Sequence, residues 1–192
     1  MKNKILMVAL SLLIVLGLYT GAGAYVLELY HIDSTITFTP QSTFGSTSRQ
    51  HMNDALYKWN EASGKTLMKR TTSTHTDTQG AHKDGKNYVY KKALTGDEAA
   101  ALAYTTTWSS SKDIVTEVDM VINSQISYAN SAQPGQFDFF SVFLHETGHP
   151  AGLNDIYDDS YESSVMYYSL SDHVEKRTLA TDDKNGIKRI YK

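Results

Sequence analysis

The chain has 192 residues, a formal net charge of −3 and no cysteine. A hydrophobic fraction of 41% and a charged fraction of 20% are typical of a globular domain and exclude a globally disordered chain. The mildly acidic balance gives no electrostatic reason to bind nucleic acid, so we expect no nucleic-acid partner. Without cysteine there is no disulfide and no thiolate ligand, so any metal must be held by His, Asp, Glu or main-chain oxygen.

The N-terminus has the pattern of a signal peptide. Lys2 and Lys4 precede an apolar run over residues 5–18, and Ala22-Gly23-Ala24 forms a small-residue cleavage signal. We predict that residues 1–24 are removed, which leaves residues 25–192 as one extracellular domain without stable membrane association. The alternative is an uncleaved segment that spans the bilayer and anchors the same domain outside the cell.

The rest of the chain mixes predicted strands and helices, which indicates an α/β fold. Asp138 can cap a helix that begins near Phe139 and extends beyond His149, and Gly64 can end an earlier helix that Ser46-Thr47-Ser48 begins. The polar residues 73–87 and the tyrosine-rich residues 154–171 read as surface loops. Alternation and apolar spacing predict strands over 35–39, 67–72, 88–94, 102–108 and 114–122, and a last helix over 181–191.

The strongest chemical signal lies on the helix predicted after Asp138. His145 and His149 are four residues apart, so a helix presents both imidazoles on one face, where they can bind one metal ion. Glu146 lies beside the first histidine and can reach a metal-bound water. This H-E-x-x-H spacing is typical of zinc proteases, in which the glutamate acts as the general base.

A third metal ligand is predicted shortly after the helix. A catalytic zinc needs three protein ligands and one open position. Gly152 permits a sharp turn that can bring Asp155 back to the metal. The alternative is that Asp155 only caps the loop and that another side chain binds instead: Asp158, Asp159 or His173.

With these residues the sequence resembles the metzincin zinc metalloproteases, and among them the matrixins. Met166 is placed as in the Met-turn of that family. Residues 113–123 look like the strand that follows the family's substrate-lining edge strand. Residues 137–142 look like the approach to the active-site helix, and residues 179–191 look like the C-terminal helix. The resemblance implies a twisted mixed sheet with an active-site helix, a Met-turn and a C-terminal helix. It also implies that an edge strand binds an extended polypeptide substrate, here Leu102, Ala103, Tyr104, Thr105 and Thr106.

Two residues depart from the usual matrixin pattern. Asp155 stands where most matrixins have histidine, although two histidines and one carboxylate are an established catalytic set. Pro150 follows the second histidine, has no N–H to donate to the Glu146 carbonyl and can displace Glu146 and His149. In the related astacins and serralysins a tyrosine two residues after the methionine stabilises the transition state, and Tyr168 has that spacing.

The predicted function is a secreted, monomeric zinc endopeptidase with catalytic zinc on His145, His149 and Asp155. The alternative is a catalytically inactive zinc-binding module that recognises peptides. Matrixins also hold a structural zinc, and His75-Thr76-Asp77 has the form of part of that site, with His82 and Asp84 nearby. The acidic loop of Asp155, Asp158, Asp159 and Glu162 could attract calcium. For both loops the alternative is an exposed loop that binds no metal.

Overall fold

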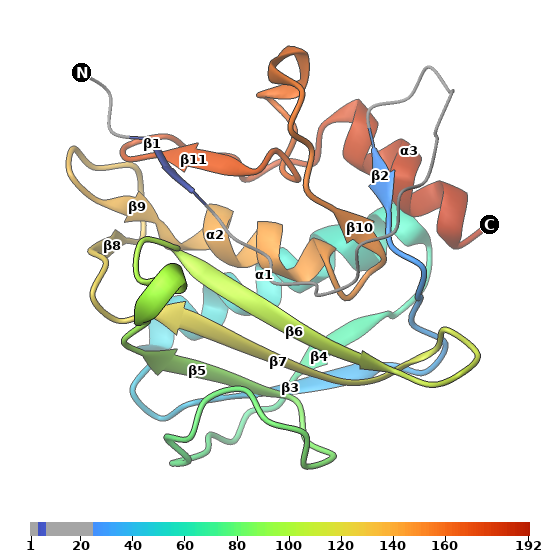
Figure 1. Cartoon of the computed structure of the whole chain (residues 1–192), viewed down its shortest axis with the longest axis horizontal. Coiled ribbons are helices and arrows are strands. Elements are labelled where there is room, and N and C mark those ends of the chain that lie inside the picture. Colours follow the sequence, from blue (N-terminus) through green and yellow to red (C-terminus); the bar gives the residue numbers. More distant parts are fainter. Residues whose placement is uncertain (1–3, 7–24) are drawn as a thin grey trace.

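The computed structural model describes residues 4–6 and 25–192, so most of the predicted signal peptide lies outside the described residues (Figure 1). The strands are β1 (Lys4–Leu6), β2 (Val26–Leu27), β3 (Ile36–Pro40), β4 (Met68–Arg70), β5 (Tyr88–Lys92), β6 (Ala103–Ser109), β7 (Val115–Asn123), β8 (Tyr128–Ala129), β9 (Phe137–Asp138), β10 (Leu153–Asn154) and β11 (Ser169–Ser171). The α-helices are α1 (Ser46–Ser63), α2 (Phe139–Gly148) and α3 (Thr181–Ile190). Short 3-10 turns span Gly96–Glu98 and Asp159–Tyr161.

A five-stranded sheet with the order β4-β3-β5-β7-β6 forms the centre of the fold. Strands β4, β3, β5 and β7 run parallel to their neighbours, and only the edge strand β6 is antiparallel. Helices α1 and α2 lie on one side of this sheet, and the loop over residues 71–87 lies on the other (Figure 1). The predicted mixed α/β fold class is therefore confirmed, and β6 is an edge strand, as the resemblance implies.

Helix α1 forms because its apolar residues recur at helical spacing. Met52, Ala55, Leu56 and Trp59 are buried on one face, and Gly64 ends the helix in the left-handed conformation, with φ 69°. The prediction that Ser46-Thr47-Ser48 caps this helix is wrong, because Gly45 is the N-cap and makes no side-chain capping bond. Trp59 Nε1 donates to the Leu144 carbonyl oxygen at 2.9 Å and so joins α1 to α2.

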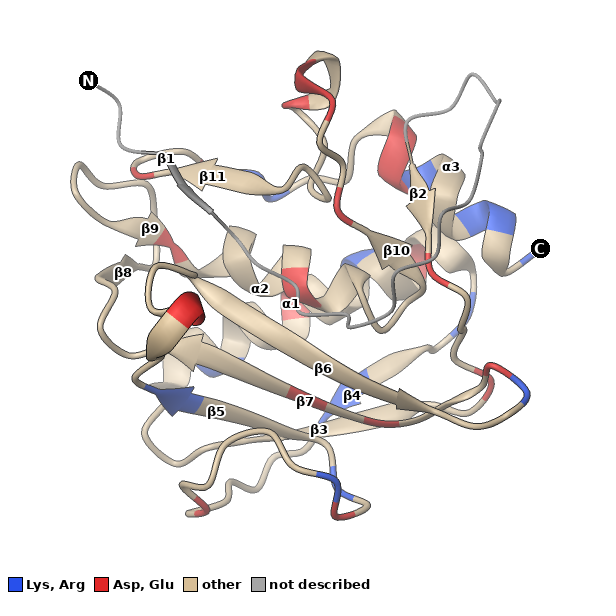
Figure 2. Ribbon diagram, in the orientation of Figure 1, with Lys and Arg blue, Asp and Glu red and all other residues tan. Residues whose placement is uncertain are grey.

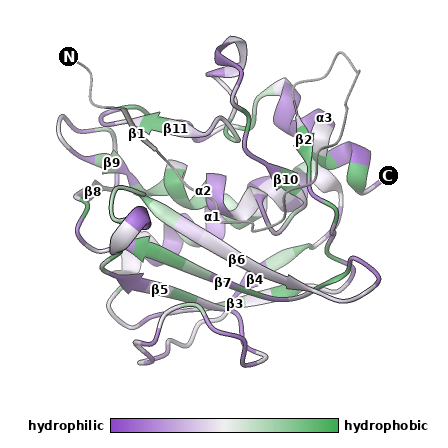
Figure 3. Ribbon diagram, viewed as in Figure 1, coloured by the Kyte–Doolittle hydropathy of each residue, from purple (hydrophilic) through white to green (hydrophobic). Residues whose placement is uncertain are grey.

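Strand β7 is covered on both faces, and nearly all of its residues are buried. On the loop side, two of its buried side chains are carboxylates. Glu117 accepts hydrogen bonds from the N–H groups of Asp84 and Gly85, at 2.7 and 2.9 Å. Asp119 accepts from the N–H groups of His82 and Tyr88, at 3.1 and 2.8 Å. These bonds hold the loop against the sheet. The apolar residues of the strands are coloured green in Figure 3.

Two-stranded pairs complete the structure. The antiparallel pairs are β1 with β11 and β2 with β10, and β8 runs parallel to β9. Acidic residues mark the loop after β10 and the start of α3, whereas the end of α3 is basic (Figure 2). Within the described residues, no helix is both long and apolar enough to cross a membrane.

Candidate active site

The residues before and after α2 fix its position. Asp138 caps the helix by accepting a 2.9 Å hydrogen bond from the Ser141 N–H, and Arg177 donates through Nε to the same carboxylate at 3.0 Å. The helix ends at Gly148, so the predicted extension beyond His149 is wrong. Pro150 is the reason, because its nitrogen has no proton to continue the helical bonds. His149 nevertheless keeps right-handed helical dihedrals, with φ −60° and ψ −57°, so Pro150 leaves its backbone in place.

The two histidines of α2 point their Nε2 atoms toward each other. His145 Nδ1 lies 2.8 Å from the Val165 carbonyl oxygen, and His149 Nδ1 lies 3.0 Å from the Leu153 carbonyl oxygen. Since a carbonyl oxygen only accepts, each Nδ1 carries the proton and each Nε2 keeps a free lone pair. The two Nε2 atoms are 3.3 Å apart and buried.

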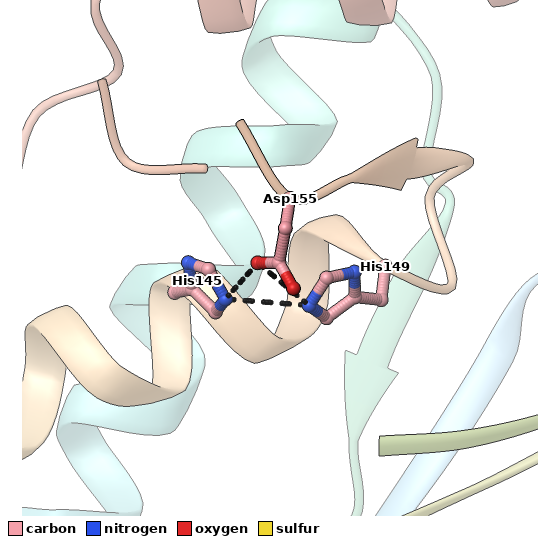
Figure 4. A group of neighbouring side chains, drawn as sticks. All are labelled: His145, His149 and Asp155. Atoms are coloured by element: carbon pink, nitrogen blue, oxygen red, sulfur yellow. Dashed lines mark hydrogen bonds and ion pairs between the residues drawn. The ribbon is translucent and has the colours of Figure 1, made fainter. Parts of the chain in front are cut away.

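Asp155 completes a group of three ligands, because the chain turns back at Gly152 (Figure 4). Gly152 has φ +98°, and a side chain there would come within 2.9 Å of the Tyr30 carbonyl oxygen. Asp155 Oδ1 lies 3.2 Å from His145 Nε2 and 3.9 Å from His149 Nε2. Among the described residues, these three form the one group whose geometry suits a metal ion.

The spacing of these atoms fits a tetrahedral zinc. Zinc bonds of about 2.0–2.1 Å at tetrahedral angles place neighbouring ligand atoms about 3.3 Å apart. The two Nε2 atoms, at 3.3 Å, and the Asp155 Oδ1–His145 Nε2 pair, at 3.2 Å, match this value, and the Asp155 Oδ1–His149 Nε2 distance of 3.9 Å is longer. Asp155 Oδ1 and Glu146 Oε1 are also buried without a hydrogen-bond partner. A buried carboxylate oxygen without a partner is costly, and a cation would compensate for both. The donor set therefore fits zinc.

Burial and mutual charge shift the pKa values of this group. Burial raises the pKa of Glu146 to about 7 and lowers that of His149 to about 4. Burial also acts against the charged forms of His145 and Asp155, but their contact outweighs it, so the pKa of His145 is raised and that of Asp155 lowered. A divalent cation between them would favour the deprotonated form of all four groups.

Glu146 lies under the edge strand of the sheet. Its side chain is fully buried, and its Oε2 accepts a 2.7 Å hydrogen bond from the Thr105 hydroxyl of β6. Thr105 was predicted as part of the substrate strand, and its bond to Glu146 was missed. The two residues are 41 positions apart, so no local sequence pattern signals the contact.

The predicted Met-turn lies beneath α2. A side chain at position 148 would collide with the Met166 sulfur and come within 2.9 Å of the Trp59 ring, so only glycine fits between them. Buried Asp183 of α3 holds this turn: it accepts from the Ser164 hydroxyl and from the N–H groups of Val165 and Met166, the latter two at 2.9 and 3.2 Å. The sequence predicted the last helix, but the contact of its Asp183 carboxylate with the Met-turn was missed.

The alternative third ligands have other contacts. Asp158 caps the 3-10 turn by accepting from the Ser160 N–H at 2.9 Å, and Asp159 accepts from the Tyr167 hydroxyl at 2.5 Å. His173 pairs with its neighbour Asp172 at 3.2 Å, and about half of its side chain is exposed. None of the three belongs to the group of Figure 4.

Tyr168 and an unpredicted tyrosine lie together near the third ligand. The Tyr168 ring packs against the rings of Tyr157 and Tyr167, with centroids 5.0 and 4.8 Å apart. The Tyr157 hydroxyl lies 3.5 Å from Asp155 Oδ2, and its ring is largely exposed. The one sequence signal for Tyr157 is its position two residues after Asp155, the predicted third ligand.

The residues considered for a structural zinc do not belong to this ligand group. His75 is buried, stacks on Tyr88 with ring centroids 4.0 Å apart and has its Nε2 3.3 Å from the Val89 carbonyl oxygen. His82 Nδ1 bonds to the Gly80 carbonyl oxygen at 2.8 Å, while Asp84 pairs with Lys86 at 2.8 Å. Neither this loop nor the acidic loop with Glu162 brings three ligand atoms together among the described residues.

Comparison with known proteins assigns the family. The sequence model of peptidase family M10, the matrixins, matches residues 30–192. No curated protein sequence matches the chain. Among solved structures, high choriolytic enzyme 1 of medaka (Oryzias latipes), a hatching enzyme zinc-protease, is 12% identical with a TM-score of 0.42, over 84% of this chain and 93% of that one. The family match spans most of the chain, and the chain therefore belongs to the matrixin family of zinc metalloendopeptidases.

Proposed function

We propose that His145, His149 and Asp155 hold the catalytic zinc of this endopeptidase and that Glu146 is its general base. One observation carries the proposal: three buried ligand atoms lie 3.2–3.9 Å from one another, and the buried Glu146 carboxylate has one oxygen without a hydrogen-bond partner. Zinc, when bound, lowers the pKa of its water and polarises the scissile carbonyl. Glu146 accepts the proton of the attacking water and delivers it to the leaving amine.

The substrate is an extended polypeptide that pairs with β6. This strand pairs with β7 along one edge over Ala103–Ser109. Its other edge pairs with no strand of the described residues. An extended peptide laid along an open edge gains main-chain hydrogen bonds, while side-chain pockets select residues. Thr105 joins this strand directly to Glu146, so a peptide on β6 would lie beside the general base.

The protein acts outside the cytoplasm as a monomer of residues 25–192. The support is the signal-peptide pattern of residues 1–24, which has a basic start, an apolar core and a small-residue exit. No calcium or second zinc is part of the proposal. The carboxylates of Glu117 and Asp119 on β7 already accept hydrogen bonds from main-chain N–H groups of the facing residues: His82, Asp84, Gly85 and Tyr88.

Hydrolysis of an unfolded protein by the purified chain tests this function. We expect activity that a zinc chelator abolishes and added zinc restores. The variant Glu146→Gln should bind zinc but lose activity by a factor of about 10²–10⁴, because it keeps the shape and loses the base. A folded, zinc-loaded wild type that hydrolyses nothing would instead support the inactive peptide-recognition module.

A further inference from the structure

Thr105 is the residue of the edge strand whose side chain hydrogen-bonds to Glu146. It lies in the middle of β6, opposite Met120 of β7, and only 5% of its surface is exposed. Its hydroxyl lies 2.7 Å from Glu146 Oε2 and 3.2 Å from the Glu146 main-chain oxygen. One buried hydroxyl therefore serves two acceptors on the same residue.

The main-chain oxygen of Glu146 has no helical donor because of Pro150. In an α-helix that carbonyl would accept from the N–H of the residue four positions later, which here is Pro150 and has no proton. A hydroxyl has a single proton, and the shorter distance assigns it to the carboxylate, with the carbonyl as a weaker second acceptor. Thr105 thus places its hydroxyl at 3.2 Å from the carbonyl that Pro150 leaves without a helical donor.

The same contact makes the two carboxylate oxygens of Glu146 different. Oε2 is held by Thr105, whereas Oε1 is buried without a hydrogen-bond partner. Glu146 directly follows the proposed ligand His145 in the chain, and the charges of His145 and Asp155 both act on its carboxylate. A bond to Oε2 restricts the rotation of the carboxylate and leaves Oε1 as the atom available to take a proton.

We propose that Thr105 is a positioning residue for the peptidase reaction: its hydroxyl fixes the Glu146 carboxylate so that Oε1 faces the attacking water. The inference rests on the proposed function of Glu146. It also links the substrate strand to the general base through a single side chain. A substrate bound along β6 and the group that deprotonates the water are then held in one fixed arrangement. Fixing reacting groups relative to each other in this way raises the reaction rate.

The test compares Thr105→Val, which keeps the shape and removes the donor, with Thr105→Ser, which keeps the donor. A hydrogen bond to a charged group is worth a factor of about 10–100, so we expect kcat to fall by that factor in Thr105→Val. KM and the zinc content should stay as in the wild type, and Thr105→Ser should keep most of the activity. The matched control is Thr116→Val, since Thr116 is exposed on β7 and donates to the Trp108 carbonyl oxygen at 3.1 Å.

A second comparison separates positioning from simple packing. Against a Glu146→Gln background, Thr105→Val should cause no further loss of kcat, because the carboxylate that it positions is already gone. Equal losses in both backgrounds, a change in KM alone, or wild-type activity in Thr105→Val would each overturn the proposal. Thr105→Ala serves as the second donor-free variant if Thr105→Val does not fold.

Crystal structures give a readout that does not depend on turnover. In zinc-loaded Thr105→Val, the Glu146 carboxylate should turn away from its wild-type orientation, and in Thr105→Ser it should keep it. An unchanged carboxylate in Thr105→Val would overturn the positioning role even if the protein hydrolysed nothing. A zinc-loaded wild type without activity would contradict the proposed function instead, so the two failures are distinguishable.

Discussion

Removal of the Asp183 carboxylate is expected to loosen the Met-turn and, through it, the first zinc ligand. This buried side chain accepts hydrogen bonds from the Ser164 hydroxyl and from the N–H groups of Val165, Met166 and Ala180. The carbonyl of Val165 in turn accepts from His145 Nδ1 at 2.8 Å. Asp183→Ala therefore leaves donors unpaired beneath the site and frees the peptide that orients the imidazole.

The size of the effect follows from those bonds. Each buried donor left unpaired costs about 1–3 kcal/mol, and partial relaxation brings the sum to about 4 kcal/mol. Typical domains are stable by about 5–15 kcal/mol, so the variant should stay folded but marginal. Groups that orient a ligating histidine contribute a factor of about 10–100 to metal affinity, and we expect zinc affinity to fall by that factor.

Urea unfolding of the metal-free protein and a competitive zinc titration measure the two effects. The control is Asn185→Ala, since Asn185 is exposed on the same helix. This substitution should leave both the free energy of unfolding and the zinc affinity close to those of the wild type. If Asp183→Ala lost less than about 1 kcal/mol of stability and bound zinc as tightly as the wild type, the supporting role of this carboxylate would be refuted.

Three further perturbations test other parts of the structure. Gly148→Ala forces a methyl group against Met166 and Trp59 and should lower the free energy of unfolding by about 1–3 kcal/mol in the same urea assay. Arg177→Met leaves the buried carboxylate that caps α2 without its charged partner and should lower the melting temperature clearly, whereas Arg189→Met on the exposed end of α3 should not. Burial raises the pKa of Asp119 to about 6, so the folded state favours its protonated form. Relative to Asp119→Asn, the wild type should therefore lose stability as pH rises from about 4 to 6, by up to about 3 kcal/mol, and a constant difference across that range would contradict this.

Local spacing predicted much of the active-site helix. The interval between His145 and His149 is a property of any α-helix, so the sequence alone could place both imidazoles on one face. Asp155 needed a turn as well, and Gly152 signals it because only glycine readily takes that positive φ. The ends of the helices were harder to predict from the sequence. Helix α1 starts after Gly45 without a side-chain cap, and Pro150 ends α2 before His149.

The supporting contacts could not be predicted because they join residues that are distant in the sequence. Thr105 reaches Glu146 across 41 positions, and Asp183 reaches Val165 across 18. Such contacts depend on how β6, α2 and α3 pack, and neither residue stands in a pattern that indicates its partner. The loop of residues 73–87 shows the same limit, since its histidines suggested a metal, yet the carboxylates that hold it come from β7.

The zinc content of the purified protein tests the central claim most directly. The wild type and Glu146→Gln should each bind one equivalent of zinc tightly. Both His149→Ala and Asp155→Ala should lose affinity by a factor of about 10² or more, because a tetrahedral catalytic site needs all three protein ligands. Undiminished zinc binding by Asp155→Ala, or a folded wild type that binds no stoichiometric zinc, would contradict the account.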